Sequence, residues 1–118
     1  MKVAVAVYND RISPVFDASK NVLVLDIKNQ QIHTKQMETF PNDSPLEKVF
    51  RLSELGVKEL ICGALSSDLA QLLNMHGIKT IPFTAGDLEE VLAAYMNKGL
   101  PHPNLRMPGY PAVMDHKE

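Results

Sequence analysis

The sequence contains few cysteine and aromatic residues. It has one cysteine, Cys62, and no tryptophan, and aromatic residues make up 6% of its 118 residues. One cysteine excludes an internal disulfide framework and a zinc site built on several cysteines. A chain of this length can still form a core, because roughly two-thirds of the unfolded surface is buried on folding at this size. We therefore expect one ordinary globular domain.

An excess of one charge and a long apolar run are also missing. Twelve basic residues against 14 acidic ones give a formal net charge of -2 at pH 7, so there is no general attraction to nucleic acid or to anionic membranes. The apolar run at residues 3–7 is far too short to span a bilayer. Only Lys2 precedes it and no small-residue cleavage site follows, unlike a signal peptide. We expect a soluble cytoplasmic protein without nucleic-acid or membrane partners.

Signatures of several enzyme classes are absent as well. The chain has no Walker motif, no G-x-G-x-x-G after the first strand and no G-x-S-x-G. Asp10, Asp17 and Asp26 raise the question of a two-metal nuclease, but that chemistry needs carboxylates that converge on paired metal ions. The first strand offers only valine and alanine side chains. We expect no enzymatic activity.

Hydrophobic periodicity predicts eight elements in the order β-β-β-α-β-α-β-α. The continuous β-branched run at residues 3–7 is typical of a strand buried on both faces. Ser44-Pro45-Leu46-Glu47 is a capping box that begins the first helix, whose predicted buried stripe is Leu46, Val49, Phe50 and Leu55. The predicted strands are residues 3–7, 22–27, 32–37, 58–62 and 78–83, and the helices begin near Ser44, Ser66 or Ser67, and Asp87, and end near Gly56, Gly77 and Gly99.

This order predicts an α/β fold: a five-stranded mixed sheet, with residues 32–37 on an edge and helices on both faces. Four prolines lie within residues 101–111, a density that prevents regular structure. We therefore expect residues 1–100 to form a single domain and residues 101–118 a flexible Pro-rich C-terminal tail. Truncation after Leu100 should then cost about 1 kcal/mol or less.

Two loops are candidates for a binding site, because ligands of open α/β sheets usually bind beyond the carboxyl ends of parallel strands. Residues 9–16 follow the first strand, and residues 62–67 join a strand to a capped helix. Cys62 near that helix N-terminus is expected to have a lowered pKa, and Gly63 would let a bulky anion approach the backbone. A thiolate with exposed amides suits a soft metal or a metal–sulfur cluster. The alternative is that Cys62 is a small buried hydrophobe.

The histidines give a weaker signal, because none of the usual metal-ligand spacings is present. His33 lies on the predicted edge strand and His76 in the last turn of a helix, where we expect both to be solvated. A tail with histidine and methionine could bring soft ligands to a metal, although a tail without such a role is favoured. Its residues of this kind are His102, Met107, Met114 and His116.

Three segments together resemble the dinitrogenase iron–molybdenum cofactor biosynthesis family. They are Ile12-Ser13-Pro14-Val15-Phe16, Leu60-Ile61-Cys62-Gly63-Ala64 and residues 86–92, and the resemblance covers about residues 1–100. It implies a ribonuclease H-like three-layer sandwich without nuclease residues. It also implies a non-enzymatic carrier or scaffold that binds an iron–sulfur or molybdenum-containing cluster or its precursor.

Some family positions differ in this chain. Many relatives read His-Phe-Gly-Arg where this chain has Val15-Phe16-Asp17-Ala18, and a glycine is frequent at the position of Ser66. Some relatives have a cysteine at the position of Tyr110. One cysteine cannot satisfy a four-thiolate iron–sulfur cluster, so we expect binding to be labile or substoichiometric.

The resemblance places the cluster between residues 9–16 and residues 62–67, with Cys62 as the metal ligand. Phe16 would pack the loop, while Arg11 and the helix amides would offset the negative charge of the cluster. The expected partners are the cluster or cluster-assembly proteins, and the expected state is a monomer or weak homodimer. The alternative function is a metal-free regulatory or protein-interaction module of the same fold. The predicted cofactor-binding residues are Asn9, Arg11, Ser13, Phe16, Gly63, Ser66 and Ser67.

Overall fold

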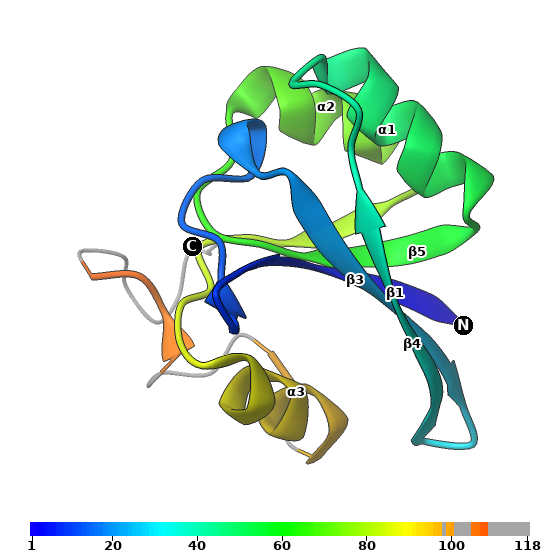
Figure 1. Ribbon diagram of the computed structural model, residues 1–118, viewed down its shortest axis with the longest axis vertical. Helices are drawn as coiled ribbons and strands as arrows, with labels where there is room; N and C mark the ends of the chain where they lie inside the picture. The colour runs from blue at the N-terminus through cyan, green and yellow to red at the C-terminus, as the bar shows by residue number, and fades with distance from the viewer. Residues whose placement is uncertain (98, 101–104, 109–118) are drawn as a thin grey trace, which may run out of the picture.

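A mixed sheet forms the middle layer of the fold (Figure 1). The protein is represented by a computed structural model that describes residues 1–97, 99–100 and 105–108. Within these residues the sheet has six strands, in the order β4-β3-β1-β5-β6, and the short β2 pairs with β1 off this path. The strands are β1 (Lys2–Tyr8), β2 (Arg11–Ile12), β3 (Asn21–Lys28), β4 (Gln31–Thr39), β5 (Val57–Ile61) and β6 (Lys79–Ile81).

The strand directions confirm the predicted mixed sheet. The β1–β3 and β3–β4 pairs are antiparallel, and the β1–β5 and β5–β6 pairs are parallel. As predicted, β4 lies on an edge. Its hairpin with β3 turns through Asn29 and Gln30, whose φ values of 53° and 63° are those of a two-residue type I′ turn.

The prediction of five strands is wrong by one. After Tyr8 the chain turns through Asn9 and Asp10, with φ values of 51° and 63°, and returns antiparallel to β1 as β2. Asparagine and aspartate tolerate this left-handed conformation better than most residues. Residues that look like a break in the strand therefore form a tight hairpin.

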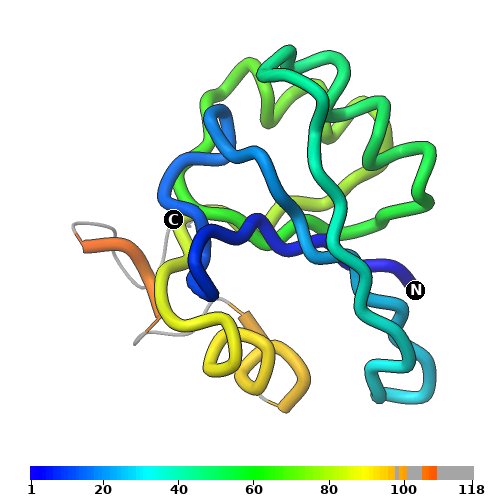
Figure 2. The backbone as a smooth tube through the Cα atoms, viewed as in Figure 1, coloured from blue at the N-terminus to red at the C-terminus, as the bar shows by residue number. Residues whose placement is uncertain are grey.

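Three helices in the described residues cover the two faces of the sheet (Figure 2). Helices α1 (Pro45–Glu54) and α2 (Ser67–Met75) lie on one face, and α3 (Leu88–Asn97) lies on the other. Alternate residues of β1 pack toward each layer: Ala4 and Ala6 toward α1 and α2, and Val3 and Val5 toward α3. None of these helices has both the length and the apolar character needed to cross a membrane.

The predicted buried stripe of α1 is correct for Val49, which is buried, and for Leu55, which packs partly buried against the core, but it is wrong for Leu46 and Phe50. Leu46 and Phe50 are 50% and 56% exposed, and Lys48, Val49 and Leu52 are the buried residues of the helix. The capping box is correct at its first residue, because the Ser44 hydroxyl accepts from the Glu47 amide at 3.3 Å. The helix therefore begins as predicted, and its buried face includes Val49 but not Leu46 or Phe50.

The described part of the tail contacts the domain, although it was expected to contribute little. The Ala85 amide donates to the Leu105 carbonyl at 2.8 Å, and the Met107 amide donates to the Phe83 carbonyl at 2.9 Å. The Leu105 side chain packs against the apolar cluster beneath α3. The prolines prevent a long strand in this segment, but they do not prevent an isolated β-bridge. The flexibility predicted for residues 101–104 and 109–118 concerns residues outside the described ranges.

This contact changes the expected effect of truncation. Removing every residue after Leu100 deletes the Leu105 side chain and two backbone hydrogen bonds, so we expect a loss of about 2 kcal/mol in the free energy of unfolding. Urea unfolding of the truncated and full-length chains measures it. Leu105→Ala in the full-length chain should reproduce about half of the loss. A change below about 0.5 kcal/mol on truncation would contradict this expectation.

Candidate functional site

The two predicted loops meet at one edge of the sheet, as expected for parallel neighbours. Because β1 and β5 run parallel, their carboxyl ends point to the same edge. The Phe16 amide donates to the Ala64 carbonyl at 2.8 Å, and the Ala64 amide donates to the Pro14 carbonyl at 2.8 Å. The loops are therefore joined backbone to backbone and form one surface rather than two walls of an open pocket.

Gly63 makes this close approach feasible. A Cβ atom at Gly63 would lie 2.4 Å from the Pro14 carbonyl oxygen and 2.5 Å from that of Ser13. The close approach expected of a bulky anion is thus made by the protein's own loop. On the other side, the Phe83 amide donates to the Gly63 carbonyl at 2.8 Å.

Cys62 is enclosed in the core rather than presented at the edge. Its side chain is fully buried in the apolar cluster beneath α1 and α2. Burial, assisted by the negative charge of Asp17, raises the pKa of the Cys62 thiol to about 12. The expectation of a lowered pKa is therefore wrong, because desolvation outweighs any effect of the nearby helix. The role of Cys62 as a metal ligand stays a prediction.

The N-terminus of α2 carries its own anion. Ser66 caps the helix as predicted, since its hydroxyl accepts from the Leu69 amide at 3.3 Å. The Ser66 amide donates to the Asp17 carboxylate at 3.0 Å. Asp17 belongs to the short 3-10 helix η1 (Phe16–Ala18). The sequence alone indicated Asp17 only as one of three carboxylates weighed for a nuclease and did not predict this link, although the departure from relatives at this position was a signal.

A buried lysine lies beneath η1. Lys48 Nζ donates to the carbonyl oxygens of Phe16 at 3.0 Å and Asp17 at 2.7 Å. It also lies 5.4 Å from the ring centre of Phe16 and 5.5 Å from that of Phe40. Burial lowers the pKa of Lys48, and the charges of Asp43 and Asp17 oppose this shift. Sequence alone does not predict this burial, because Lys48 lies outside the predicted buried stripe of the helix.

The remaining predicted residues divide into exposed and buried groups. Asn9, Arg11 and Ser67 are exposed, and the Arg11 side chain has no ion-pair or hydrogen-bond partner among the described residues. Ser13 is buried, and its hydroxyl accepts from that of Ser19 at 2.6 Å. Phe16 is buried edge-to-face against Phe40, with ring centres 6.0 Å apart. Buried residues thus shape the edge, and exposed ones are free to contact a ligand.

Two neighbouring surface depressions lie at this edge and share Tyr8, which is 63% exposed. Their volumes are about 310 and 440 Å³, at the lower end of the range for small-molecule sites. Tyr8, Ser13, Pro14, Val15 and Ala18 line the smaller one, and Val7, Tyr8, Asn9, Asp10, Asn21, Met37 and Leu88 line the larger.

Comparison with known proteins identifies the family. Residues 1–98 match the family described as Dinitrogenase iron-molybdenum cofactor. The chain belongs to this family. The matched residues include both loops of the candidate edge, and the match ends before residues 105–108. A search of curated proteins gives no significant match.

Solved structures share the fold of this family member. The crystal structure of PH0822 has a TM-score of 0.79 at 19% identity and covers 86% of this chain and 95% of its own. The protein MJ0327 of Methanocaldococcus jannaschii has a TM-score of 0.71 at 19% identity, covering 86% and 92%. The apo form of the orange protein of Desulfovibrio gigas has a TM-score of 0.71 at 16% identity, covering 89% and 94%.

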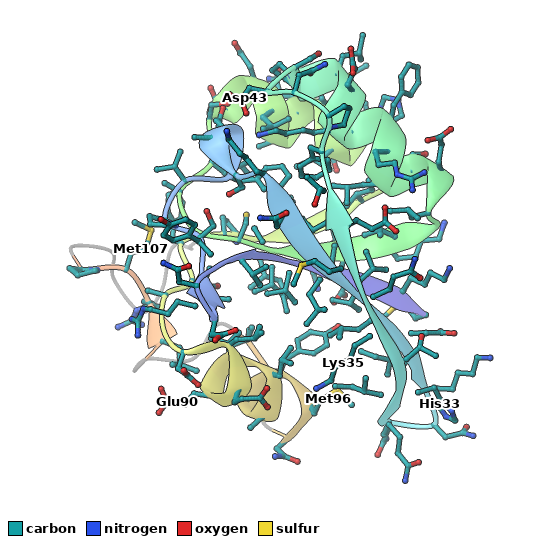
Figure 3. All side chains as sticks on the ribbon, viewed as in Figure 1. His33, Lys35, Asp43, Glu90, Met96 and Met107 are labelled. Atoms are coloured by element: carbon teal, nitrogen blue, oxygen red, sulfur yellow. The ribbon has the colours of Figure 1, made fainter. Side chains whose placement is uncertain are left out.

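The described residues of this family member offer few metal donors. Within them, no group of three or more His, Cys, Asp or Glu side chains is placed to hold a metal ion. His33 lies near the tip of the β3–β4 hairpin, on the opposite side of the view from Met107 (Figure 3). His76 Nδ1 lies 2.9 Å from the Leu72 carbonyl oxygen. His102 and His116 lie outside the described ranges.

Proposed function

We propose that this protein is a non-enzymatic carrier or scaffold that holds a metal–sulfur cluster, or its precursor, as cargo. The observation that carries the proposal is the joining of residues 13–16 to residues 62–64 into one surface at the carboxyl edge of the sheet. Both segments lie inside the stretch that matches the family. The family description names an iron-molybdenum cofactor, which supports an iron–sulfur or molybdenum-containing cluster as the cargo class.

The exposed residues of the edge would make the contacts with the cargo. Asn9 and Arg11 lie at the β1–β2 turn and Ser67 in the first turn of α2. Such clusters carry negative charge, and the exposed Arg11 guanidinium would offset it. The buried Ser13, Phe16 and Gly63, with the helix cap Ser66, would hold the surface in shape.

Cys62 is retained as the proposed metal ligand, on the condition that the loop over it opens. A thiol must lose its proton and reach the metal in order to bind, and both are opposed by burial in the present conformation. A single cysteine also leaves most positions of a cluster without a thiolate. Both considerations favour weak, labile retention of cargo.

Several finer assignments belong to the same proposal. We propose a ribonuclease H-like sandwich, supported by the strand order β4-β3-β1-β5-β6 and by helices on both faces. We also propose a cytoplasmic location, partners among cluster-assembly proteins and a monomer or weak homodimer. Family membership supports this assembly context.

The proposal is tested by reconstitution under anaerobic conditions with ferrous iron and sulfide, with and without molybdate. We expect the wild type to retain iron below one cluster per chain and to absorb in the visible range. Arg11→Gln should reduce the retained iron by about 3- to 10-fold, because it removes one charged contact with the cargo. Iron analysis after gel filtration and the absorption spectrum measure both.

Lys58→Gln is the matched control, because it removes the same charge from an exposed residue at the amino end of β5. Cys62→Ala tests ligation: equal iron in this variant and in the wild type would remove Cys62 from the metal-ligand role. Equal iron in Arg11→Gln and Lys58→Gln would contradict the proposed edge.

No retained iron in the wild type would favour the metal-free interaction module. The observation that supports this alternative is the exposure of three apolar side chains, Leu46, Phe50 and Met75.

A further inference from the structure

A chain of contacts connects α1 to the first turn of α2 through η1. Lys48 of α1 donates from its buried Nζ to the carbonyl oxygens of Phe16 and Asp17. The Phe16 amide donates to Ala64, and the Asp17 carboxylate accepts from the Ser66 amide. One ammonium group therefore holds η1, whose Phe16 and Asp17 make two of the hydrogen bonds that join the two loops.

The partners of Lys48 indicate what its charge is for. Taking an ammonium out of water is costly, and an apolar residue of similar size often serves stability as well. Two carbonyl oxygens and the ring of Phe16 belong to η1, and Phe40 completes the enclosure. The remaining partner is the 66% exposed Asp43, at 4.0 Å (Figure 3). Both hydrogen bonds of the ammonium therefore go to the η1 turn, whereas Asp43 contributes a longer ion pair.

We propose that Lys48 is a positioning residue of the cargo-binding edge. Its ammonium fixes η1, and η1 in turn fixes Asp17 on the Ser66 amide and Phe16 on Ala64. A buried ionic group is well suited to such a task, because its hydrogen bonds allow one arrangement where an apolar contact allows several. The consequence for cargo rests on the proposed function, whereas the mechanical link rests on the contacts alone.

The experiment compares amide hydrogen exchange by NMR in the full-length wild type, Lys48→Met and Asp43→Asn. Lys48→Met keeps the length and apolar stem of the side chain but removes the charge and donors. We expect the Ser66 amide to exchange about tenfold faster in Lys48→Met. The Leu69 amide, bonded to the Ser66 hydroxyl in the same helical turn, should stay within about twofold of the wild type. Asp43→Asn should leave both amides unchanged.

Three other results of the exchange experiment would overturn the positioning role of Lys48. Unchanged Ser66 exchange in folded Lys48→Met would overturn the proposal, and so would equal acceleration of Ser66, Leu69 and the β1 amides, since that marks a general loss of stability. If Lys48→Met does not fold, Lys48→Gln is judged by the same amides; failure of both to fold shows that the ammonium serves the whole fold and overturns the proposal.

Iron retention separates this inference from the proposed function. Under the same anaerobic reconstitution, Lys48→Met should retain several-fold less iron than the wild type and Asp43→Asn should retain as much. Faster Ser66 exchange with undiminished iron would show that the turn does not matter for cargo and would overturn the positioning role. If the wild type itself retains no iron, the proposed function fails, while the amide comparison still decides whether Lys48 fixes the turn.

Discussion

Replacing Gly63 with alanine is expected to lower the free energy of unfolding by about 3 kcal/mol. The new Cβ would lie 2.4 Å from the Pro14 carbonyl oxygen and 2.5 Å from that of Ser13. Both are backbone atoms, so no side chain can rotate away and the loop itself must move. That movement would break the Ala64–Pro14 and Phe16–Ala64 hydrogen bonds. Chemical unfolding measures the loss, which is a large part of the 5–15 kcal/mol typical of a domain.

Gly56→Ala is the matched control for this substitution. Gly56 has a φ of +78° with nothing within 4 Å of the added Cβ, whereas Gly63 has no left-handed φ. The control therefore reports backbone strain without a clash, at an expected cost of about 1 kcal/mol. If Gly63→Ala costs no more than Gly56→Ala, the loops are not as tightly joined as the contacts indicate. Gly63→Ala should also reduce iron retention, because the edge itself is displaced.

Local chemistry explains which parts of the fold could be predicted. Ser44 and Ser66 cap helices because their hydroxyls accept hydrogen bonds from the backbone amides three residues later. Such a contact depends on nearby sequence alone. The β3–β4 hairpin and the parallel β5–β6 pair follow from pattern and order. By contrast, β2 depends on two consecutive left-handed residues, Asn9 and Asp10. Asn-Asp is a weaker signal for such a turn than Asn-Gly or Asp-Gly.

The missed parts of the site depend on contacts between distant segments. Lys48 is buried because carbonyl oxygens of η1, some 30 residues earlier in the chain, are placed to accept from it. Without those partners a lysine at this helix position would face solvent. It shares the buried face of α1 with Val49 and Leu52, while Leu46 and Phe50 are exposed. Periodicity shows that a helix has an apolar stripe, but it cannot anticipate a lysine that is satisfied by another loop.

Cys62 shows the same limit at the centre of the candidate site. Its position at the end of β5 was predicted, but its environment depends on how closely residues 13–16 approach Gly63. Once that loop is in place, the thiol is part of the apolar cluster and its pKa rises rather than falls. The loops therefore meet where the sequence indicates, and their contact is what encloses the Cys62 thiol.

Native Cys62 is expected to react with iodoacetamide at pH 8 at least about a thousandfold more slowly than the unfolded chain. The thiolate is the reactive form, and raising the pKa from 9.0 to about 12 lowers its population at this pH by about three powers of ten. Burial of the sulfur slows the reaction further. Mass spectrometry of the alkylated fraction over time, in buffer and in denaturant, measures the ratio. A native rate within tenfold of the unfolded rate would show that the loop over Cys62 opens readily, as direct ligation requires.

The same pKa shift predicts how stability depends on pH. The unfolded thiol loses its proton near pH 9, whereas the folded one keeps it to about pH 12. The unfolded state therefore binds fewer protons between these values, and this contribution to stability is complete below pH 9 and falls as the pH rises. Cys62→Ala should reduce the alkaline decline by up to about 1.4 kcal/mol per pH unit. Urea unfolding of the wild type and of Cys62→Ala between pH 8 and 11 measures the difference in their free energies of unfolding. Lysine and tyrosine titrations contribute equally to both proteins and therefore cancel in this difference. Parallel curves would mean that the folded thiol ionises as readily as the unfolded one, and Cys62 would then be available as a ligand without any opening of the loop.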